Sequence, residues 1–181
     1  NFYDGLFPGM RFHNKPILDK PFIFDLNPSY STKTQSLSGS GVVSVNQFNR
    51  DSRLFQVRYS FSGSLFHYAP DAVYTRYNPS VSLRFRQNNL RDNRKQTLLF
   101  RQVTVNREKS NFVVEDATAE NYTVFNAKYF NTKTEVTNHF NFSSDVQFSN
   151  KFGKLAAEIE YRKLFNNNRQ INLRFYAGTF L

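Results

Sequence analysis

The sequence contains no cysteine and no long hydrophobic run, and each absence excludes a class of protein. Without cysteine the chain cannot hold a disulfide, a thiolate zinc site or a cysteine nucleophile. It has no run of about 18 apolar residues, the length that a membrane-spanning helix needs, and its mean hydropathy is −0.59. Apolar residues spaced three and four apart over three turns, the helical pattern, are also missing. The sequence therefore predicts neither a helical membrane protein nor a mainly helical fold.

Aromatic residues are abundant, although the chain is polar on average. The 181 residues include 21 Phe and 10 Tyr, with one Met and no Trp. This length suits one domain or one closed β-structure. A polar chain can still cover one surface with apolar side chains if the two kinds of residue alternate along strands. The composition therefore directs attention to period-two patterns.

The stretch Leu54–Phe66, LFQVRYSFSGSLF, alternates almost without a break. One side of an extended chain would carry Phe55, Val57, Tyr59, Phe61 and Leu65, and the other Gln56, Arg58, Ser60, Ser62 and Ser64. A strand of a soluble protein is usually about 5–6 residues long. The alternation here lasts about twice as long as that usual strand, which calls for an unusual solvent on the apolar side.

The same pattern predicts ten strands separated by turn residues. They are Gly5–His13, Pro21–Ser31, Leu37–Phe48, Leu54–Phe66, Tyr77–Gln87, Gln96–Asn106, Asn121–Phe130, His139–Phe148, Lys154–Phe165 and Ile171–Leu181. Helix-favouring Ala, Glu and Lys occur in Lys154–Phe165, but its apolar residues alternate, so we expect a strand. Gly39 and Gly41 inside a strand suit a bend or a close approach of two backbones. No linker or repeat divides the chain, so we expect one domain over residues 1–181.

Strands of this length match the apolar layer of a bacterial outer membrane. At a rise of ~3.3 Å per residue and a tilt of ~40°, a strand of about 11 residues climbs about 28 Å. The apolar band of an outer-membrane barrel is about 25 Å tall. Lipid offers no hydrogen bonds, so a sheet can span it only when closed. We predict an all-β fold, an antiparallel transmembrane β-barrel of about ten strands or part of a larger barrel, with the lipid bilayer of the outer membrane as its partner.

The alternation assigns side chains to two surfaces of such a barrel. The predicted lipid-facing residues are Phe55, Val57, Tyr59, Phe61, Val81, Leu83, Phe85, Ile159, Tyr161, Leu173 and Phe175. The predicted lumen-facing residues are Arg58, Ser60, Arg84, Arg86, Glu158, Glu160, Arg162 and Arg174. The net charge of +10 is spread along the chain, which favours a shared polar surface over a basic patch. Because neighbours in a strand point to opposite faces, rings and basic groups should not share a surface, and we expect no nucleic-acid partner.

A hairpin around FNNNRQ fixes one register. Matching the apolar sides sets Tyr161 opposite Leu173 and Ile159 opposite Phe175, which puts Glu160 opposite Arg174. A slip of two residues one way brings Glu158 there instead, and a slip the other way opposes two arginines, which is unfavourable. We therefore expect Arg174 to pair with a glutamate.

Residues typical of catalysis are present but are not grouped. His13, His67 and His139 stand alone, without the second histidine of an HExxH zinc motif. Ser64 and His67 would face opposite sides of a strand. Glu158 and Glu160 share a face, about 6.6 Å apart along the strand, and ion pairing with arginine is the simpler role for them. We expect no catalytic residue, no metal ligand and no cofactor, and hence no enzymatic activity of this chain alone.

The first segment, NFYDGLFPGMRFHN, starts with Asn, an aromatic residue, Tyr, Asp and Gly. This start resembles that of the carboxy-terminal barrel-like region of certain Bacteroidetes metallopeptidases, which join an aminopeptidase-like zinc domain of the gluzincin type to a β-rich membrane region. RYNPSVSLRFRQ and INLRFYAGTFL are similar to that region too. The resemblance implies that a peptidase domain precedes Asn1 in the same polypeptide and that this chain is its membrane anchor or pore.

Two other functions stay open on the sequence. One is a stand-alone channel whose basic lumen favours anions. The other is a soluble basic β-domain that binds an anionic partner, which would stay monodisperse without detergent.

Overall fold

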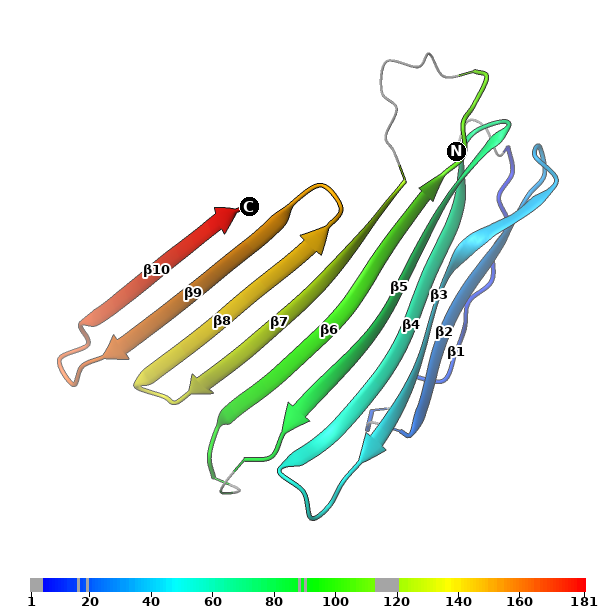
Figure 1. The fold of residues 1–181 in the computed structure, drawn as a ribbon. Helices are drawn as coiled ribbons and strands as arrows, with labels where there is room; N and C mark the ends of the chain where they lie inside the picture. The colour runs from blue at the N-terminus through cyan, green and yellow to red at the C-terminus, as the bar shows by residue number, and fades with distance from the viewer. Residues whose placement is uncertain (1–4, 16, 19, 88, 90, 113–120) are drawn as a thin grey trace. The chain divides into compact units, whose positions relative to one another are not determined.

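A computed structural model describes residues 5–15, 17, 18, 20–87, 89, 91–112 and 121–181 (Figure 1). The described chain forms ten antiparallel β-strands in one sheet, and each strand pairs with its neighbours in sequence. The strands are β1 (Phe12–His13), β2 (Phe22–Ser31), β3 (Ser36–Phe48), β4 (Leu54–Ala69), β5 (Ala72–Phe85), β6 (Arg94–Arg107), β7 (Tyr122–Thr134), β8 (Asn138–Ser149), β9 (Gly153–Leu164) and β10 (Gln170–Phe180). Each of the ten predicted segments therefore contains a strand, and the all-β prediction is confirmed.

Two predicted boundaries were wrong. The predicted strands Leu54–Phe66 and Tyr77–Gln87 left a long connection around Pro70, but this stretch is a two-residue turn, so that β4 ends at Ala69 and β5 starts at Ala72. Pro and Asp are typical turn residues, and two of them suffice to reverse a β-hairpin. At the other end of the chain, β1 is only two residues long. The segment before it still bonds to β2, from Met10 N to the Pro28 carbonyl (3.0 Å) and from Tyr30 N to the Pro8 carbonyl (2.9 Å). Residues 1–4, on which part of the family resemblance rests, lie outside the described residues.

The strand order ends at β1 and β10, and these two strands are not paired with each other in the described residues. The sheet is therefore not closed into the predicted barrel. In the part of the chain that the structure describes, no helix is long and apolar enough to cross a membrane.

The chain divides into two compact units. Unit 1 comprises Asn1–Asn46, Tyr59–Ser80 and Gln102–Thr123, and unit 2 comprises Gln47–Arg58, Val81–Arg101 and Val124–Leu181. Unit 1 thus holds β1, β2 and most of β3, while unit 2 holds β8, β9, β10 and nearly all of β7. The boundary between the units crosses β3 to β7.

Few apolar side chains are buried in either unit. Among the described residues the buried hydrophobic ones are Val57, Ala69, Ala72, Val105 and Ala156. The buried polar ones are Asp25, Ser31, Ser38, Ser44, Asn46, Gln56, His67 and Asn126. Large apolar side chains are instead exposed along most strands. This distribution is the reverse of a soluble domain, in which large apolar residues fill the core.

Gly39 allows β3 to pass close to β2. It lies opposite Pro28 in the ladder and has φ +143°, a conformation that other residues rarely adopt. A Cβ at this position would come within 2.2 Å of the Asn27 carbonyl oxygen. The close backbone approach expected from the sequence is therefore confirmed here.

The hairpin of β9 and β10 has the predicted register. Leu173 lies opposite Tyr161, Phe175 opposite Ile159, and Arg174 opposite Glu160. Its turn is closed by a hydrogen bond from Phe165 N to the Arg169 carbonyl (2.8 Å), and Asn168 takes a positive φ of 58°, which asparagine tolerates well.

Candidate polar face

In unit 2 a row of polar side chains crosses four strands on one face of the sheet. Thr132 of β7 lies opposite Asn141 of β8, Asn141 opposite Glu160 of β9, and Glu160 opposite Arg174 of β10. The Thr132 hydroxyl donates to Asn141 Oδ1 (2.9 Å), and Asn141 Nδ2 donates to Glu160 Oε2 (3.2 Å). The row is therefore joined by hydrogen bonds from β7 to β9.

Arg174 ends this row between two carboxylates. Its Nε forms an ion pair with Glu158 Oε1 and lies 3.6 Å from Glu160 Oε1. Glu160 is directly opposite in the ladder, but Glu158 makes the closer contact, since a long arginine side chain can lean along the neighbouring strand. The predicted pairing of Arg174 with a glutamate is confirmed, with both glutamates as partners.

A second polar row, which the sequence analysis missed, runs from β6 to β8. Arg101 Nε donates to Asn126 Oδ1 (2.8 Å), and the amide of the buried Asn126 donates to Asp145 Oδ1. Gln147 Nε2 donates to Asp145 Oδ2 (2.9 Å). Val124 and Phe130 lie on the same face of β7 as Asn126, and these apolar residues break the alternation of polar and apolar side chains. The polar Asn126 in mid-strand was therefore the signal of this row in the sequence.

The opposite face of unit 2 carries apolar rows. Phe142, Ile159 and Phe175 lie side by side across β8, β9 and β10, and so do Phe140, Tyr161 and Leu173. In these strands the registers therefore separate four predicted lipid-facing residues from the glutamates and Arg174. Arg162, on the polar side, lies opposite His139 and Asn172.

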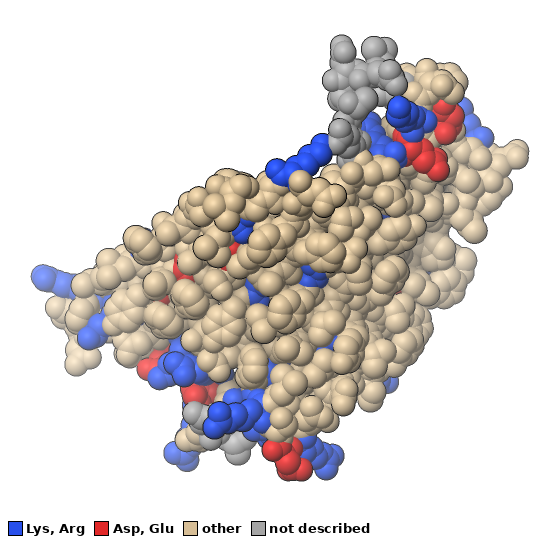
Figure 2. All heavy atoms as spheres, in the orientation of Figure 1, with Lys and Arg blue, Asp and Glu red and all other residues tan. Residues whose placement is uncertain are grey.

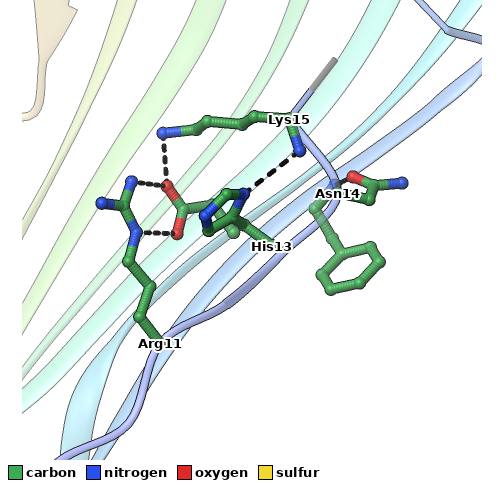
Figure 3. A network of polar contacts seen from close by, with 6 residues as sticks. Arg11, His13, Asn14 and Lys15 are labelled. Atoms are coloured by element: carbon green, nitrogen blue, oxygen red, sulfur yellow. Dashed lines mark hydrogen bonds and ion pairs between the residues drawn. The ribbon is translucent and has the colours of Figure 1, made fainter.

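Unit 1 contains a charged cluster that the sequence analysis did not find (Figure 3). Arg11 donates two hydrogen bonds to the Asp25 carboxylate, from Nε to Oδ1 (2.9 Å) and from Nη2 to Oδ2 (2.8 Å). Lys15 Nζ forms an ion pair with the same Oδ2. Asn14 holds the backbone beside the cluster, because its Nδ2 donates to the Phe22 carbonyl (3.0 Å) and its Oδ1 accepts from Phe24 N (2.7 Å). Asp25 stood on the polar side of a predicted strand, which was the one signal for it.

His67, which is buried in unit 1, contacts serines other than Ser64, the serine considered in the sequence analysis. His67 Nε2 lies 3.2 Å from Ser36 Oγ, and Nδ1 lies 3.3 Å from Ser38 Oγ. These contacts give hydrogen-bond partners to a buried imidazole, as burial of a polar ring requires.

Ser60, predicted to face the lumen, shares a hydrogen bond of 2.8 Å with Ser44. Because Ser44 pairs opposite Ile23 and alternates with Val43 and Val45, Ser60 lies on the face away from those valines.

The expected separation of rings and basic groups fails at one end of unit 2. The guanidinium groups of Arg84 and Arg86 lie 6.0 Å and 5.5 Å from the centre of the Phe55 ring. Alternation fixes only the direction of Cβ, and arginine is long enough to reach a ring on a neighbouring strand. Alternation alone therefore gives no reason to expect the absence of a nucleic-acid partner.

The remaining predicted residues differ in exposure. Arg58, Val81, Leu83 and Phe85 are half-buried, Val57 is buried, and Tyr59 and Phe61 are exposed. Within the described ranges, no group of three or more His, Asp and Glu side chains is placed to hold a metal ion. Comparison with protein-family models, with curated proteins and with solved structures finds no match to this chain.

Proposed function

We propose that this chain is a transmembrane β-barrel, or part of one, in a bacterial outer membrane, where it acts as the membrane anchor or pore region of a larger protein. The observation that carries the proposal is the reversed distribution of side chains. Five hydrophobic residues are buried in the described chain, three of them alanines, against 33 large apolar residues that are exposed. Soluble monomers rarely expose contiguous apolar surface on this scale, which supports an apolar solvent around this chain.

Strand length and hydrogen bonding support the same solvent. Strands β3 to β10 have 11 to 16 residues, and about 9–11 tilted residues are enough to span a bilayer. The polar rows of unit 2 suit a surface turned away from lipid, because their donors and acceptors bind one another or water. In lipid the free edges of β1 and β10 would each need a strand partner, since an unpaired backbone group costs several kcal/mol there.

An anion-selective channel has less support than an anchor. The polar face of unit 2 carries Asp145, Glu158 and Glu160 as well as Arg101, Lys128, Lys154, Arg162 and Arg174, so carboxylates offset more than half of its positive charge. The link to a metallopeptidase rests on the resemblance of the strand segments alone. Reading the gene upstream of the codon for Asn1 tests it, and an open reading frame without HExxH would remove it.

The test of the membrane proposal compares two neighbours on β10. Phe175 and Tyr176 are 65% and 59% exposed and lie on opposite faces, opposite Ile159 and Glu158. If the face of Phe175 meets lipid, Phe175→Lys should cost about 2–4 kcal/mol near the bilayer midplane. Tyr176→Lys should cost little, because the new cation faces Glu158. Urea titrations of the chain refolded in phospholipid vesicles measure both changes in the free energy of unfolding.

Tyr59 and Ser60, neighbours that the sequence assigns to opposite faces, would make a poorer pair, because the Ser60 hydroxyl bonds to Ser44 and its replacement would also break that contact. A soluble β-domain exposes both residues to water, so both substitutions would then cost about the same. Equal costs in vesicles would overturn the membrane proposal.

A further inference from the structure

A basic hollow lies in unit 2 at the end of the sheet where β5 joins β6. Its volume is about 490 Å³, and its lining residues are Phe55, Arg84, Phe85, Arg86, Gln87, Asn89, Arg94 and Lys95. Figure 2 shows Lys and Arg side chains at this end of the sheet, with Asp and Glu side chains among them. Four of the eight lining residues are cationic, and none is acidic.

The cations of the hollow have no carboxylate partner among the described residues. Ion pairs within 4.0 Å are formed elsewhere, by Arg11, Lys15, Lys133 and Arg174. The nearby Asp92 accepts a hydrogen bond from the backbone N–H of Arg94 (3.0 Å) and does not line the hollow. Arg84, Arg94 and Lys95 are therefore available to an anion from solution.

Hydrogen bonds to the backbone fix the side chains of two residues that line the hollow. Arg86 donates from Nε to the Ser52 carbonyl (3.0 Å) and from Nη2 to the Asn49 carbonyl (2.8 Å). Gln87 Nε2 donates to the Arg94 carbonyl (2.7 Å), which ties the two sides of the connection together. These bonds fix Arg86 beside the Phe55 ring without neutralising it. A fixed cation lowers the entropy that an anion must overcome on binding.

We propose that this hollow binds a phosphate group. Arginine presents a planar fork of donors that matches phosphate oxygens, and lysine adds a point charge. Phenylalanine beneath the guanidinium groups is compatible with a ligand at a lipid–water boundary, where the phosphate of an anionic phospholipid lies. The same chemistry would take free inorganic phosphate. The hollow lies wholly within unit 2, so the site does not depend on barrel closure.

The test uses the whole chain in micelles of an uncharged detergent. Phosphatidylglycerol is added in increasing proportion, and binding is followed by the NMR signals of the arginine Nε–H groups. Arg84→Gln with Arg94→Gln removes two cations whose side chains donate no hydrogen bond to the described walls of the hollow, although Arg84 lies over the Phe55 ring. Each cation near an anionic lipid surface contributes about fivefold in affinity, so the double variant should bind about 25-fold more weakly.

A matched control removes the same charge from the β9–β10 hairpin of the same unit. Lys163→Gln with Arg169→Gln should change the affinity roughly twofold or less, because these residues do not line the hollow. Equal weakening by the two double variants would mean attraction by net charge alone and would overturn the site, and so would absence of binding to the unaltered chain.

Competition by inorganic phosphate distinguishes the two sources. If phosphate displaces the lipid from the unaltered chain, the phosphate group itself is recognised. If only the lipid binds, and the hollow variant weakens it, the ligand is a phospholipid headgroup. In either case circular dichroism should show the same strand content for both variants, which keeps loss of folding apart from loss of the site.

Discussion

Asp25 in unit 1 and Arg174 in unit 2 are each held by two partners, with the signs of the charges exchanged. One carboxylate meets Arg11 and Lys15, and one guanidinium meets Glu158 and Glu160. The two centres differ in solvent access, because the Asp25 side chain is 12% exposed and the Arg174 side chain 70% exposed. Water can replace the partners of an exposed charge, whereas a desolvated charge depends on them. The same three-residue arrangement should therefore stabilise the two units very differently.

The position of each strand in the sheet explains the difference in solvent exposure between Asp25 and Arg174. Asp25 lies in β2, which has β1 on one side and β3 on the other, and it pairs opposite His13 and Val42. Arg174 lies in β10, which among the described residues pairs with β9 only. A strand with one neighbour leaves its side chains open on one flank. We therefore expect edge position, more than the number of ionic partners, to decide how strongly such a cluster stabilises the fold.

The largest effect should come from Asp25→Asn. The substitution keeps the size of the side chain but leaves Arg11 and Lys15 facing each other without an anion. We expect the urea midpoint of unfolding to fall further than it does for Arg174→Gln, because the Asp25 carboxylate that is removed is largely shielded from water, whereas Arg174 is exposed; Arg11 and Lys15 themselves stay in contact with water. Equal shifts of the two midpoints would show that exposure does not rank these clusters.

A smaller difference in stability should distinguish the contributions of Glu158 and Glu160, the two partners of Arg174. Arg174→Glu places three carboxylates together and should lower stability. Adding Glu158→Arg should restore more than adding Glu160→Arg, since Glu158 makes the closer contact and Glu160 keeps its bond from Asn141. Double-mutant cycles measured by urea titration give both coupling energies. Stronger rescue by Glu160→Arg would mean that ladder position outweighs side-chain contact.

The smallest effect concerns a carboxylate with neutral partners, Asp71 in the turn between β4 and β5. Its Oδ1 accepts from the Ser110 hydroxyl (2.5 Å) and its Oδ2 from Asn111 N (2.9 Å). These hydrogen bonds hold the pKa of Asp71 below its usual value. A lowered pKa means that the contact contributes fully above the unfolded pKa of about 4 and is lost as the pH falls through the lower folded pKa.

We therefore expect the Asn111 amide proton to move in an NMR titration below about pH 4 while the strands persist. In Asp71→Asn the same signal should show no such transition. An identical titration of Asn111 in the variant would assign the acid response to another group.

Most strands were predictable because alternation is local, whereas the clusters depend on pairings between segments. The β9–β10 register followed from sequence since both strands alternate cleanly and opposed arginines excluded one slip. Asp25 was missed because its partners come from a segment with only two residues of regular strand. The approach of Arg86 to Phe55 was missed for another reason. Period two gives the direction of Cβ but not the place where a long side chain ends.

The strand order has a consequence for how such a chain is built and altered. Among the described residues every strand pairs only with the strands before and after it in sequence, so each hairpin can form as soon as its two strands exist. Low sequence separation between contacts favours fast folding. It also means that one hairpin can be duplicated or deleted in the gene while all other pairings keep their partners. The width of the sheet is therefore a quantity that evolution, or an engineer, can change in steps of two strands.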